Sequence, residues 1–520
     1  MHEPIPLLHD YLIRSARELP DKVALVCGER RVTYAELDAH SNAIANHLQA
    51  TGVVRGDRVV IFGDNTVETV VGFWAALKAN AIVCLVNPLT KRGKLEYLLN
   101  DCSPAAMITD GHLRHIFDEP ARACRSLSSI IISGEIGDAD LAELHVAVRW
   151  KRAIIAGRDR APARKCIDID LATIVYTSGS TGDPKGVMLT HRNMLTACTS
   201  ISSYLSIEKN DVILNVLPLA FDYGLYQMIM AFGAGARLVL ERSFAFPAQI
   251  LILIAKEGVT GLPGVPTLFA MLSGLKSIWQ YDLSSLRYVT NTGAALPVKH
   301  IRMLRELVPA ASIYSMYGLT ECKRCTYLPP EDIDRKPLSV GIAIPNTEIW
   351  LIDEEDNRVD PGGIGQLVVR GATVMQGYWG KPEATAERLR PGPLPGENVL
   401  YTGDYCRIDD EGYLYFVGRS DEIIKSRGEK VAPREVENAL MSISGVREAA
   451  VIGVPDELLG EAIKAFVVPE QGANLDEKAV QKECQKRLES FMVPKSIAIV
   501  PSLPRTDTQK LNKRALQLPH

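Results

Sequence analysis

The chain has 520 residues, with 58 basic and 62 acidic side chains and a formal net charge of −4 at pH 7. This near balance gives no sign of a nucleic-acid partner. The N-terminus lacks a basic region followed by an apolar stretch, so we expect no signal peptide. The most apolar segment, 225–240, is too short and too interrupted for a transmembrane helix.

The ten cysteines are scattered along the chain. Cys322 and Cys325 form a C-x-x-C motif, but no second pair stands at the spacing of a zinc site. We therefore expect reduced thiols and a cytoplasmic location.

A chain of this length is expected to form two or more domains. Its first 110 residues alternate between helical and strand patterns. Helical spacing occurs at 7–19, 34–48, 67–78 and 91–99, and strand patterns occur at 23–26, 31–33, 58–62, 82–86 and 106–109. This alternation predicts a largely parallel sheet covered by helices on both faces. Residues 133–165 are charged and irregular, and we interpret them as a connection.

A short apolar run at 171–175 leads into the stretch Y-T-S-G-S-T-G-D-P-K-G at 176–186. Glycines allow the backbone to approach a ligand closely, hydroxyl and backbone N–H groups bind phosphate oxygens, and a lysine adds positive charge. The stretch is not a Walker A loop, because Lys185 follows a proline and precedes a glycine. It predicts a triphosphate-binding loop, and the alternative is a flexible polar surface loop.

Helical and strand patterns continue to alternate after this loop. Helical patterns lie at 192–205 and 248–257, strands at 212–216, 237–240, 286–290 and 313–316, and a proline-containing loop at 261–267. Polar or glycine-rich motifs begin at 176, 291 and 317, each where a predicted strand ends. Ligands of parallel sheets bind beyond the carboxyl ends of strands, so these motifs predict one site at one sheet edge.

In the C-terminal third the pattern changes from alternating strands and helices to short strands separated by turns, followed by a mixed α+β segment. Short strands at 349–352, 366–369, 400–404 and 413–418 predict a small β subdomain. Helices at 433–441 and 475–488 with strands at 448–454 and 464–468 predict a compact α+β module. We expect an α/β protein with a large multi-subdomain domain at 1–420 and a small α+β domain at 421–520.

Four motifs occur in a consistent order along nearly the whole chain. They are the loop at 176–186, Y-G-L-T-E at 317–321, Y-T-G-D at 401–404 and G-R-S-D at 418–421. Together they resemble the adenylate-forming superfamily, which includes acyl-CoA synthetases, adenylation domains of peptide synthetases and firefly-type luciferases.

The resemblance implies an AMP-forming acid–thiol ligase that uses ATP and Mg²⁺. A small-molecule carboxylic acid would react with ATP to give acyl-AMP and pyrophosphate, and the acyl group would then pass to coenzyme A. The alternative is a freestanding amino-acid adenylation enzyme that charges the phosphopantetheine of a separate carrier protein. A luciferase-type oxygenase or an amide-forming ligase would share these motifs. A regulator without catalysis is disfavoured by the presence of both Lys185 and Lys510.

The resemblance also implies roles for individual residues. Glu321 would ligate Mg²⁺, and the catalytic residues would be Thr320, Glu321 and Lys510, where Lys510 is a lysine near the C-terminus. The family usually has glycine where this chain has Gln509. The residues implied to bind ATP or AMP are Thr177, Ser178, Gly179, Ser180, Thr181, Gly182, Lys185, Gly293, Ala294, Ala295, Tyr317, Gly318, Thr320, Asp404 and Arg419.

In the family the small domain is a mobile lid that rotates between the two half-reactions, and the hinge here would be Asp421. The loop that then faces the thiol would contain Lys425, Gly428 and Lys430.

The acid pocket implied by the resemblance includes Phe221, Asp222, Tyr223, Gly264 and Val265. Phe221-Asp222 resembles a pair in amino-acid adenylation domains whose carboxylate binds the substrate amine. Alignment on the flanking residues shifts Asp222 by one place, however. Asp222 is therefore either an amine anchor or a capping aspartate at the start of a helix.

Overall fold

The structure is a computed structural model that describes residues 6–157, 160–177, 184–419, 422, 424–426, 429–456, 460–488, 490–506 and 511–517. The chain divides into two compact units, one of Met1–Glu348 and Arg370–Leu400 and the other of Ile349–Val369 and Tyr401–His520. The predicted domain boundary at 420/421 lies outside the described residues and stays a prediction. Across the described ranges, no helix is long and apolar enough to cross a membrane.

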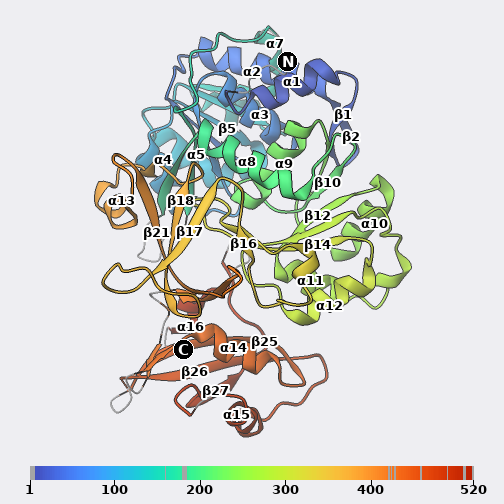
Figure 1. Ribbon diagram of the computed structural model, residues 1–520. Coiled ribbons are helices and arrows are strands. Elements are labelled where there is room, and N and C mark those ends of the chain that lie inside the picture. The colour runs from blue at the N-terminus through green and yellow to red at the C-terminus, as the bar shows by residue number, and fades with distance from the viewer. Residues whose placement is uncertain are drawn as a thin grey trace. The chain divides into compact units, whose positions relative to one another are not determined.

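The first unit contains a nine-stranded sheet with the order β16-β15-β14-β13-β12-β10-β11-β1-β2 in the described part of the chain (Figure 1). Strands β14, β13, β12, β10, β11 and β1 run parallel, and antiparallel strands lie at both edges. The strands are β1 (Val23–Cys27), β2 (Arg30–Thr33), β10 (Val212–Asn215), β11 (Arg237–Leu240), β12 (Gly261–Gly264), β13 (Tyr288–Asn291), β14 (Ser312–Tyr317), β15 (Thr326–Tyr327) and β16 (Ile342–Ala343).

Several helices lie between the strands of this sheet in the chain order, among them the largely buried helix α9. Helices α10, α11 and α12 lie beside β12 and β14 in the green to yellow part of Figure 1. The bounds are α1 (Asp10–Glu18), α8 (His191–Leu205), α9 (Asp222–Ala234), α10 (Pro247–Glu257), α11 (Pro266–Ser273), α12 (Val298–Leu307), η2 (Ile278–Gln280) and η3 (Pro330–Asp332).

In the described residues, an eight-stranded sheet with the order β19-β9-β8-β4-β3-β5-β6-β7 forms the other large part of the first unit. Its strands are β3 (Arg58–Phe62), β4 (Ile82–Val86), β5 (Ala106–Asp110), β6 (Ser129–Ser133), β7 (Ala147–Arg149), β8 (Leu171–Thr177), β9 (Lys185–Thr190) and β19 (Gly377–Tyr378). Its helices are α2 (Tyr34–Ala50), α3 (Val67–Lys78), α4 (Arg92–Cys102), η1 (Gly111–Leu113), α5 (Arg114–Ala123), α6 (Asp138–Ala142), α7 (Trp150–Ala156) and α13 (Pro382–Arg388).

Helices cover both faces of this sheet. Neighbouring residues of a strand point to opposite faces, so the two faces pack against different helices. Val60 and Met107 belong to a buried apolar cluster with residues of α4 and α5. Ile61 and Ile108 instead face Gly72 of α3, where an added Cβ would stand 3.0 Å from the Ile108 side chain. The predicted fold class, α/β with mostly parallel sheets, is confirmed for this unit.

The second unit holds most of a sheet with the order β17-β18-β21-β20, with β22 paired to β21. A further sheet, β24-β23-β26-β25 with β27 paired to β26, belongs to the predicted α+β module. The bounds are β17 (Thr347–Ile352), β18 (Ile364–Gly371), β20 (Leu389–Pro391), β21 (Asn398–Ile408), β22 (Leu414–Arg419), β23 (Ile424–Ser426), β24 (Glu429–Val431), α14 (Pro433–Met441), β25 (Val446–Asp456), β26 (Gly460–Pro469), α15 (Glu477–Gln485), β27 (Ser496–Ile499) and α16 (Lys513–Gln517).

Two sequence expectations are wrong. The charged segment 133–165 contains α6, β7 and α7, and β7 extends the eight-stranded sheet by pairing with β6. The predicted loop at 261–267 begins with β12, a fully buried strand between β10 and β13. Glycine and proline usually signal a turn, but here Gly261 leaves room for Tyr288, whose hydroxyl oxygen would lie 2.3 Å from an added Cβ.

The register of the nine-stranded sheet places two of the three predicted motifs, those at 291 and 317, at one edge. Gly264 pairs with Asn291, and Asn291 pairs with Ser315, so β12, β13 and β14 end at nearly the same level. The segments after these strands begin at Val265, Thr292 and Gly318. The expectation of one site at one sheet edge holds for the motifs at 291 and 317 but is wrong for the motif at 176, because β8, the strand before it, belongs to the other sheet.

A buried lysine joins the first two long helices of the chain. The Lys78 ammonium of α3 lies 2.6 Å from the Asp38 carboxylate of α2 and donates to Ser41 Oγ at 2.7 Å and Asn42 Oδ1 at 2.8 Å. Lys78 is almost fully buried, whereas a quarter of the Asp38 side chain is exposed. A buried charge of this kind is tolerated only while its partners remain in place.

We therefore expect Asp38→Ala to lower the free energy of unfolding by about 3 kcal/mol, because it leaves the Lys78 charge buried without a counterion. The measurement is the midpoint of thermal unfolding. The control is Arg92→Ala, which removes an ion pair to Glu119 between two exposed side chains and should cost about 0–1 kcal/mol. Equal shifts in the two variants would contradict this role of Asp38.

Candidate active site

The strands on either side of the predicted phosphate loop form an antiparallel pair. Thr177 at the end of β8 lies opposite Lys185 at the start of β9, and the Thr177 hydroxyl donates to the Lys185 carbonyl at 3.4 Å. The Tyr97 hydroxyl donates to the Pro184 carbonyl at 3.1 Å. Ser178, Gly179, Ser180, Thr181 and Gly182 lie outside the described residues, so their predicted role stays a prediction.

Lys185 and Glu321 meet at one tyrosine. The Lys185 ammonium lies 5.3 Å from the centre of the Tyr378 ring, and the Tyr378 hydroxyl donates to Glu321 Oε1 at 2.8 Å. The Met375 amide also donates to the Glu321 carbonyl at 2.7 Å. Tyr378 belongs to β19, which pairs with β9, so a strand of the eight-stranded sheet contacts Glu321 in the turn that follows β14 of the other sheet.

Tyr317 and Gly318 begin a tight turn after β14. The Cys325 amide donates to the Tyr317 carbonyl at 2.9 Å, and the Cys322 amide donates to the Leu319 carbonyl at 3.1 Å. A Cβ at Gly318 would lie 2.2 Å from the Lys323 carbonyl oxygen, so this position accepts only glycine without a shift of the turn. The turn presents Glu321 to the Tyr378 hydroxyl.

The motif at 291–295 follows β13. The Asn291 side chain donates to the Ala294 carbonyl at 2.9 Å, and Gly293 has φ +85°, a conformation that glycine adopts without strain. Ala294 and Ala295 therefore follow a bend fixed by these two residues.

The predicted acid-pocket residues come from the segments after β10 and β12. Phe221 is the N-cap of α9 and Tyr223 donates to the Thr290 carbonyl at 3.0 Å, so the start of α9 is fixed to β13. Val265 is the N-cap of α11. At Gly264 an added Cβ would lie 2.5 Å from the Phe269 ring, which requires a small residue for packing.

Asp222 does not cap α9, because it is the first helical residue and the cap residue Phe221 makes no side-chain cap bond. Its carboxylate lies 3.9 Å from the ammonium of Lys323. Lys323 and Arg324 are not among the residues predicted from the sequence, although their basic side chains are each only 5% exposed. Their signal in the sequence is their position shortly after the T-E motif, separated from it by Cys322.

The remaining predicted site residues belong to the second unit. Asp404 of β21 pairs with Arg419 of β22, and Asp404 Oδ1 lies 3.9 Å from an Arg419 guanidinium nitrogen. The backbones of Lys425 and Lys430 pair between β23 and β24. Asp421, Gly428 and Lys510 lie outside the described residues.

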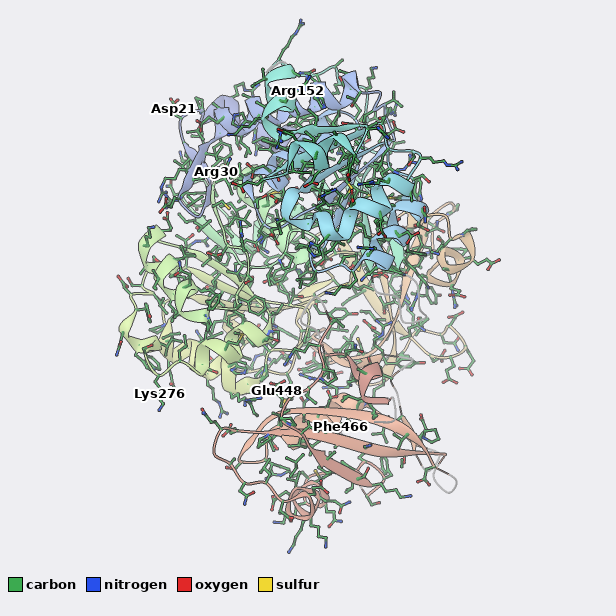
Figure 2. All side chains as sticks on the ribbon, turned by 180° about the vertical axis from the view of Figure 1, so that it is seen from behind. Asp21, Arg30, Arg152, Lys276, Glu448 and Phe466 are labelled. Atoms are coloured by element: carbon green, nitrogen blue, oxygen red, sulfur yellow. The ribbon has the colours of Figure 1, made fainter. Side chains whose placement is uncertain are left out.

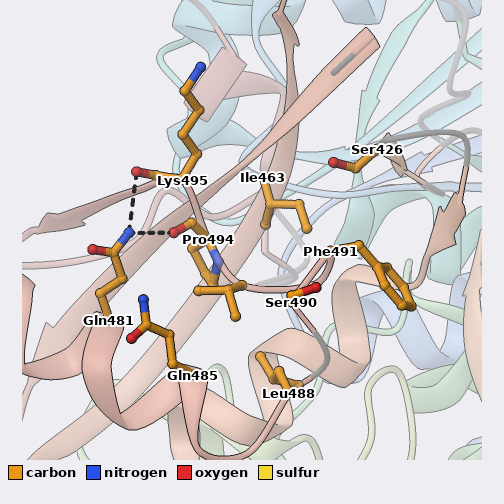
Figure 3. Close-up of a pocket in the computed structure, with 10 residues that line it drawn as sticks. Ser426, Ile463, Gln481, Gln485, Leu488, Ser490, Phe491, Pro494 and Lys495 are labelled. Carbon is orange, nitrogen blue, oxygen red and sulfur yellow. Dashed lines mark hydrogen bonds between the residues drawn. The ribbon is translucent and has the colours of Figure 1, made fainter. Parts of the chain in front are cut away.

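The second unit also contains a pocket of about 590 Å³ (Figure 3). The Gln481 side chain donates to the Pro494 carbonyl at 2.8 Å at its rim. None of the sequence-predicted site residues lines it; the lining residues are Ser426, Ile463, Gln481, Gln485, Leu488, Ser490, Phe491, Val493, Pro494 and Lys495.

Comparisons with known proteins agree with this arrangement. Residues 12–379 match the family described as AMP-binding enzyme, and residues 435–510 match the AMP-binding enzyme C-terminal domain. A long-chain-fatty-acid–CoA ligase of Salmonella typhimurium is 32% identical over 97% of this chain and 92% of its own length. A feruloyl-CoA synthase of Amycolatopsis is 32% identical over 97% of each chain.

Among solved structures, the anthranilate CoA ligase AuaEII in complex with anthranoyl-AMP superimposes with a TM-score of 0.90 at 27% identity, over 99% of this chain and 97% of that one. The chain belongs to the AMP-binding enzyme family, the adenylate-forming superfamily indicated by its motifs. It is an AMP-forming acyl-CoA synthetase.

Replacing Gly318 should damage the site without unfolding the protein. Gly318→Ala places a Cβ 2.2 Å from the Lys323 carbonyl oxygen, so the turn that carries Thr320 and Glu321 must move. Because such small displacements cost about a hundredfold, ATP–pyrophosphate exchange should fall by about that factor. The control is Gly274→Ala, where the nearest atom is 3.5 Å from the added Cβ. Equal exchange rates in the two variants would show that the turn tolerates a side chain.

Proposed function

We propose that this chain forms its acyl-CoA product in two half-reactions that use the residues identified above. In the first, a carboxylate oxygen of the acid attacks the α-phosphorus of ATP, acyl-AMP forms and pyrophosphate leaves. In the second, the sulfur of coenzyme A attacks the acyl carbonyl, AMP leaves and the thiol proton is released. Catalysis of the first step rests on positioning and on stabilising developing charge.

The contact of Tyr378 with both Lys185 and Glu321 is the observation that carries this proposal. Lys185 and Thr177 adjoin the predicted phosphate loop, so their segment would hold the β- and γ-phosphates. Thr320 would bind the α-phosphate, and Tyr317 with the segment Gly293, Ala294 and Ala295 would flank the adenine. Asp404 would accept the ribose hydroxyls, and Arg419 would contact the ribose or a phosphate.

The proposed Mg²⁺ ligand is Glu321. Mg²⁺ takes one or two protein carboxylates together with phosphate oxygens and water, and a single carboxylate beside the phosphate loop fits this demand. The Tyr378 hydroxyl bond fixes the orientation of that carboxylate through Oε1. Glu321 would hold the metal, which would supply positive charge to neutralise the phosphates when bound.

Coenzyme A is the proposed thiol acceptor, since the three relatives described above are CoA ligases. The alternative of a freestanding enzyme that charges a carrier protein gains no support from them. Their acids are a long-chain fatty acid, a feruloyl group and anthranilate, so their names span several classes of acid. ATP–pyrophosphate exchange across fatty, aryl, dicarboxylic and amino acids, followed by assay of the CoA thioester, tests the proposal.

Two lysine variants separate the half-reactions. Lys185→Ala should raise KM for ATP or lower kcat, because it removes a charge beside the phosphates. Lys510→Ala should lose acyl-AMP formation by about a thousandfold, the order expected when a transition-state contact is removed, yet should convert supplied acyl-AMP to thioester. The control is Lys276→Ala, at an exposed lysine that projects from the surface (Figure 2). Equal losses of Lys510→Ala in both half-reactions would refute its assignment to the first.

The hinge assignment is tested by Asp421→Pro. Proline fixes φ near −65°, so a residue whose φ and ψ must change between the two half-reactions is held in one state. We expect a first turnover to release pyrophosphate while thioester formation collapses. If both half-reactions run at the rate of the unmodified enzyme, the hinge lies elsewhere.

A further inference from the structure

Two cations are buried in the turn that follows Glu321. Lys323 has φ +66° and Arg324 follows it, and both side chains are 5% exposed. The turn is held by the backbone bonds to Tyr317 and Leu319 and by contact of the Cys322 and Cys325 sulfurs at 3.0 Å. Buried lysine and arginine are uncommon and require partners, so their surroundings indicate what the turn is built to bind.

Among the described residues, Asp222 is the carboxylate within ion-pairing distance of Lys323. Its ammonium lies 3.9 Å from Asp222 Oδ2 and 5.3 Å from the centre of the Tyr226 ring. Within the described ranges, its buried Nζ has no hydrogen-bond partner. Burial lowers the pKa of Lys323, and the Asp222 charge acts in the opposite direction. The ammonium therefore retains its donors for a further acceptor.

Arg324 lies beside the motif after β13. One terminal nitrogen donates to the Thr292 hydroxyl at 2.6 Å, and the guanidinium lies 5.1 Å from the centre of the Tyr223 ring. Its Nε is buried and has no hydrogen-bond partner among the described residues. Nor does any carboxylate of the described residues lie within ion-pairing distance of the guanidinium.

The charges of this cluster do not balance. Lys323 and Arg324 are both basic, while Asp222 is the carboxylate facing them from α9. Glu321 acts on Lys323 at longer range, but its carboxylate is bonded to Tyr378. The uncharged side chains Tyr223, Tyr226 and Thr292 also contact these two cations. A buried cation without a counterion is costly, so the cluster is complementary to an anion.

We propose that Lys323 and Arg324 bind a second anionic group of the acid substrate, and that this enzyme prefers dicarboxylic acids. The inference rests on the proposed function, because it places the cluster in the acid pocket. Three residues of that predicted pocket adjoin the cluster: Asp222 faces Lys323, Tyr223 donates to the Thr290 carbonyl, and Gly264 pairs with Asn291, the residue before Thr292. One carboxylate of the substrate would react with ATP, and the other would accept hydrogen bonds from Lys323 Nζ and Arg324 Nε.

The same charges argue against Asp222 as an amine anchor. Asp222 already faces the Lys323 ammonium, so a substrate amine would add a third cation to a cluster with one facing carboxylate. Its role in this proposal is to hold Lys323 in place.

The test compares acids of equal length in the unmodified enzyme, such as hexanoate against adipate and benzoate against isophthalate. For each pair, kcat/KM is measured by ATP–pyrophosphate exchange and by CoA thioester formation. We expect the diacid to exceed the monoacid by about a hundredfold, because buried donors left without acceptors discriminate strongly. If monoacids or amino acids exceed diacids, the inference is overturned while the ligase function stands. If no acid supports exchange, the proposed function itself fails.

Variants then assign the preference to the two cations. Lys323→Met and Arg324→Met should each reduce the diacid-to-monoacid ratio of kcat/KM by about tenfold or more. Arg324→Lys should retain part of this ratio because it keeps a positive charge. Lys276→Met is the matched control on the surface. Folding of each variant is checked by thermal unfolding, and an unchanged ratio in folded Lys323→Met and Arg324→Met would overturn the assignment.

Discussion

The hydrogen bond from the Tyr378 hydroxyl to Glu321 is the contact on which the geometry of the site depends. Glu321 follows a strand of the nine-stranded sheet, and Tyr378 belongs to a short strand paired with β9 of the eight-stranded sheet. A carboxylate that receives a hydroxyl bond and whose own backbone carbonyl binds the Met375 amide has little freedom to rotate. The position of Glu321 therefore depends on both sheets, one through β14 and the other through β19.

This constraint has a second effect on the chain beyond Glu321. The backbone must reverse immediately to reach β15, and the reversal brings the Lys323 carbonyl against Gly318. The turn therefore carries its next two side chains inward, beneath α9, where Tyr223 and Tyr226 receive them. One tight turn carries both Glu321, the proposed Mg²⁺ ligand, and the two cations proposed to bind the acid substrate.

Much of the fold was predictable because apolar periodicity and strand-end motifs are local signals. The alternation at 58–110 and the position of the T-E motif after a strand follow directly from the residue order. β12 was not predictable, because Gly261 and Pro263 signal a turn and only the neighbouring Tyr288 explains them. β7 has three residues, too few to show a period.

Some residues of the candidate site could likewise be predicted from the sequence, and others could not. Glu321 and Lys185 were found from motifs, but their common neighbour Tyr378 comes from a two-residue strand with no motif of its own. Lys323 and Arg324 escaped notice because a charged pair in a sequence normally indicates solvent. Only the packing of α9 against the turn shows that their charge is enclosed.

The position of the first hairpin has a consequence for synthesis of the chain. β1 joins the nine-stranded sheet by pairing with β11, and Val26 lies opposite Val239. A ribosome therefore releases β1 and β2 roughly two hundred residues before their permanent neighbour exists. Until then the hairpin keeps an unpaired edge with the apolar residues Leu25 and Val26, which invites association between nascent chains. During this interval the hairpin can be bound by molecular chaperones.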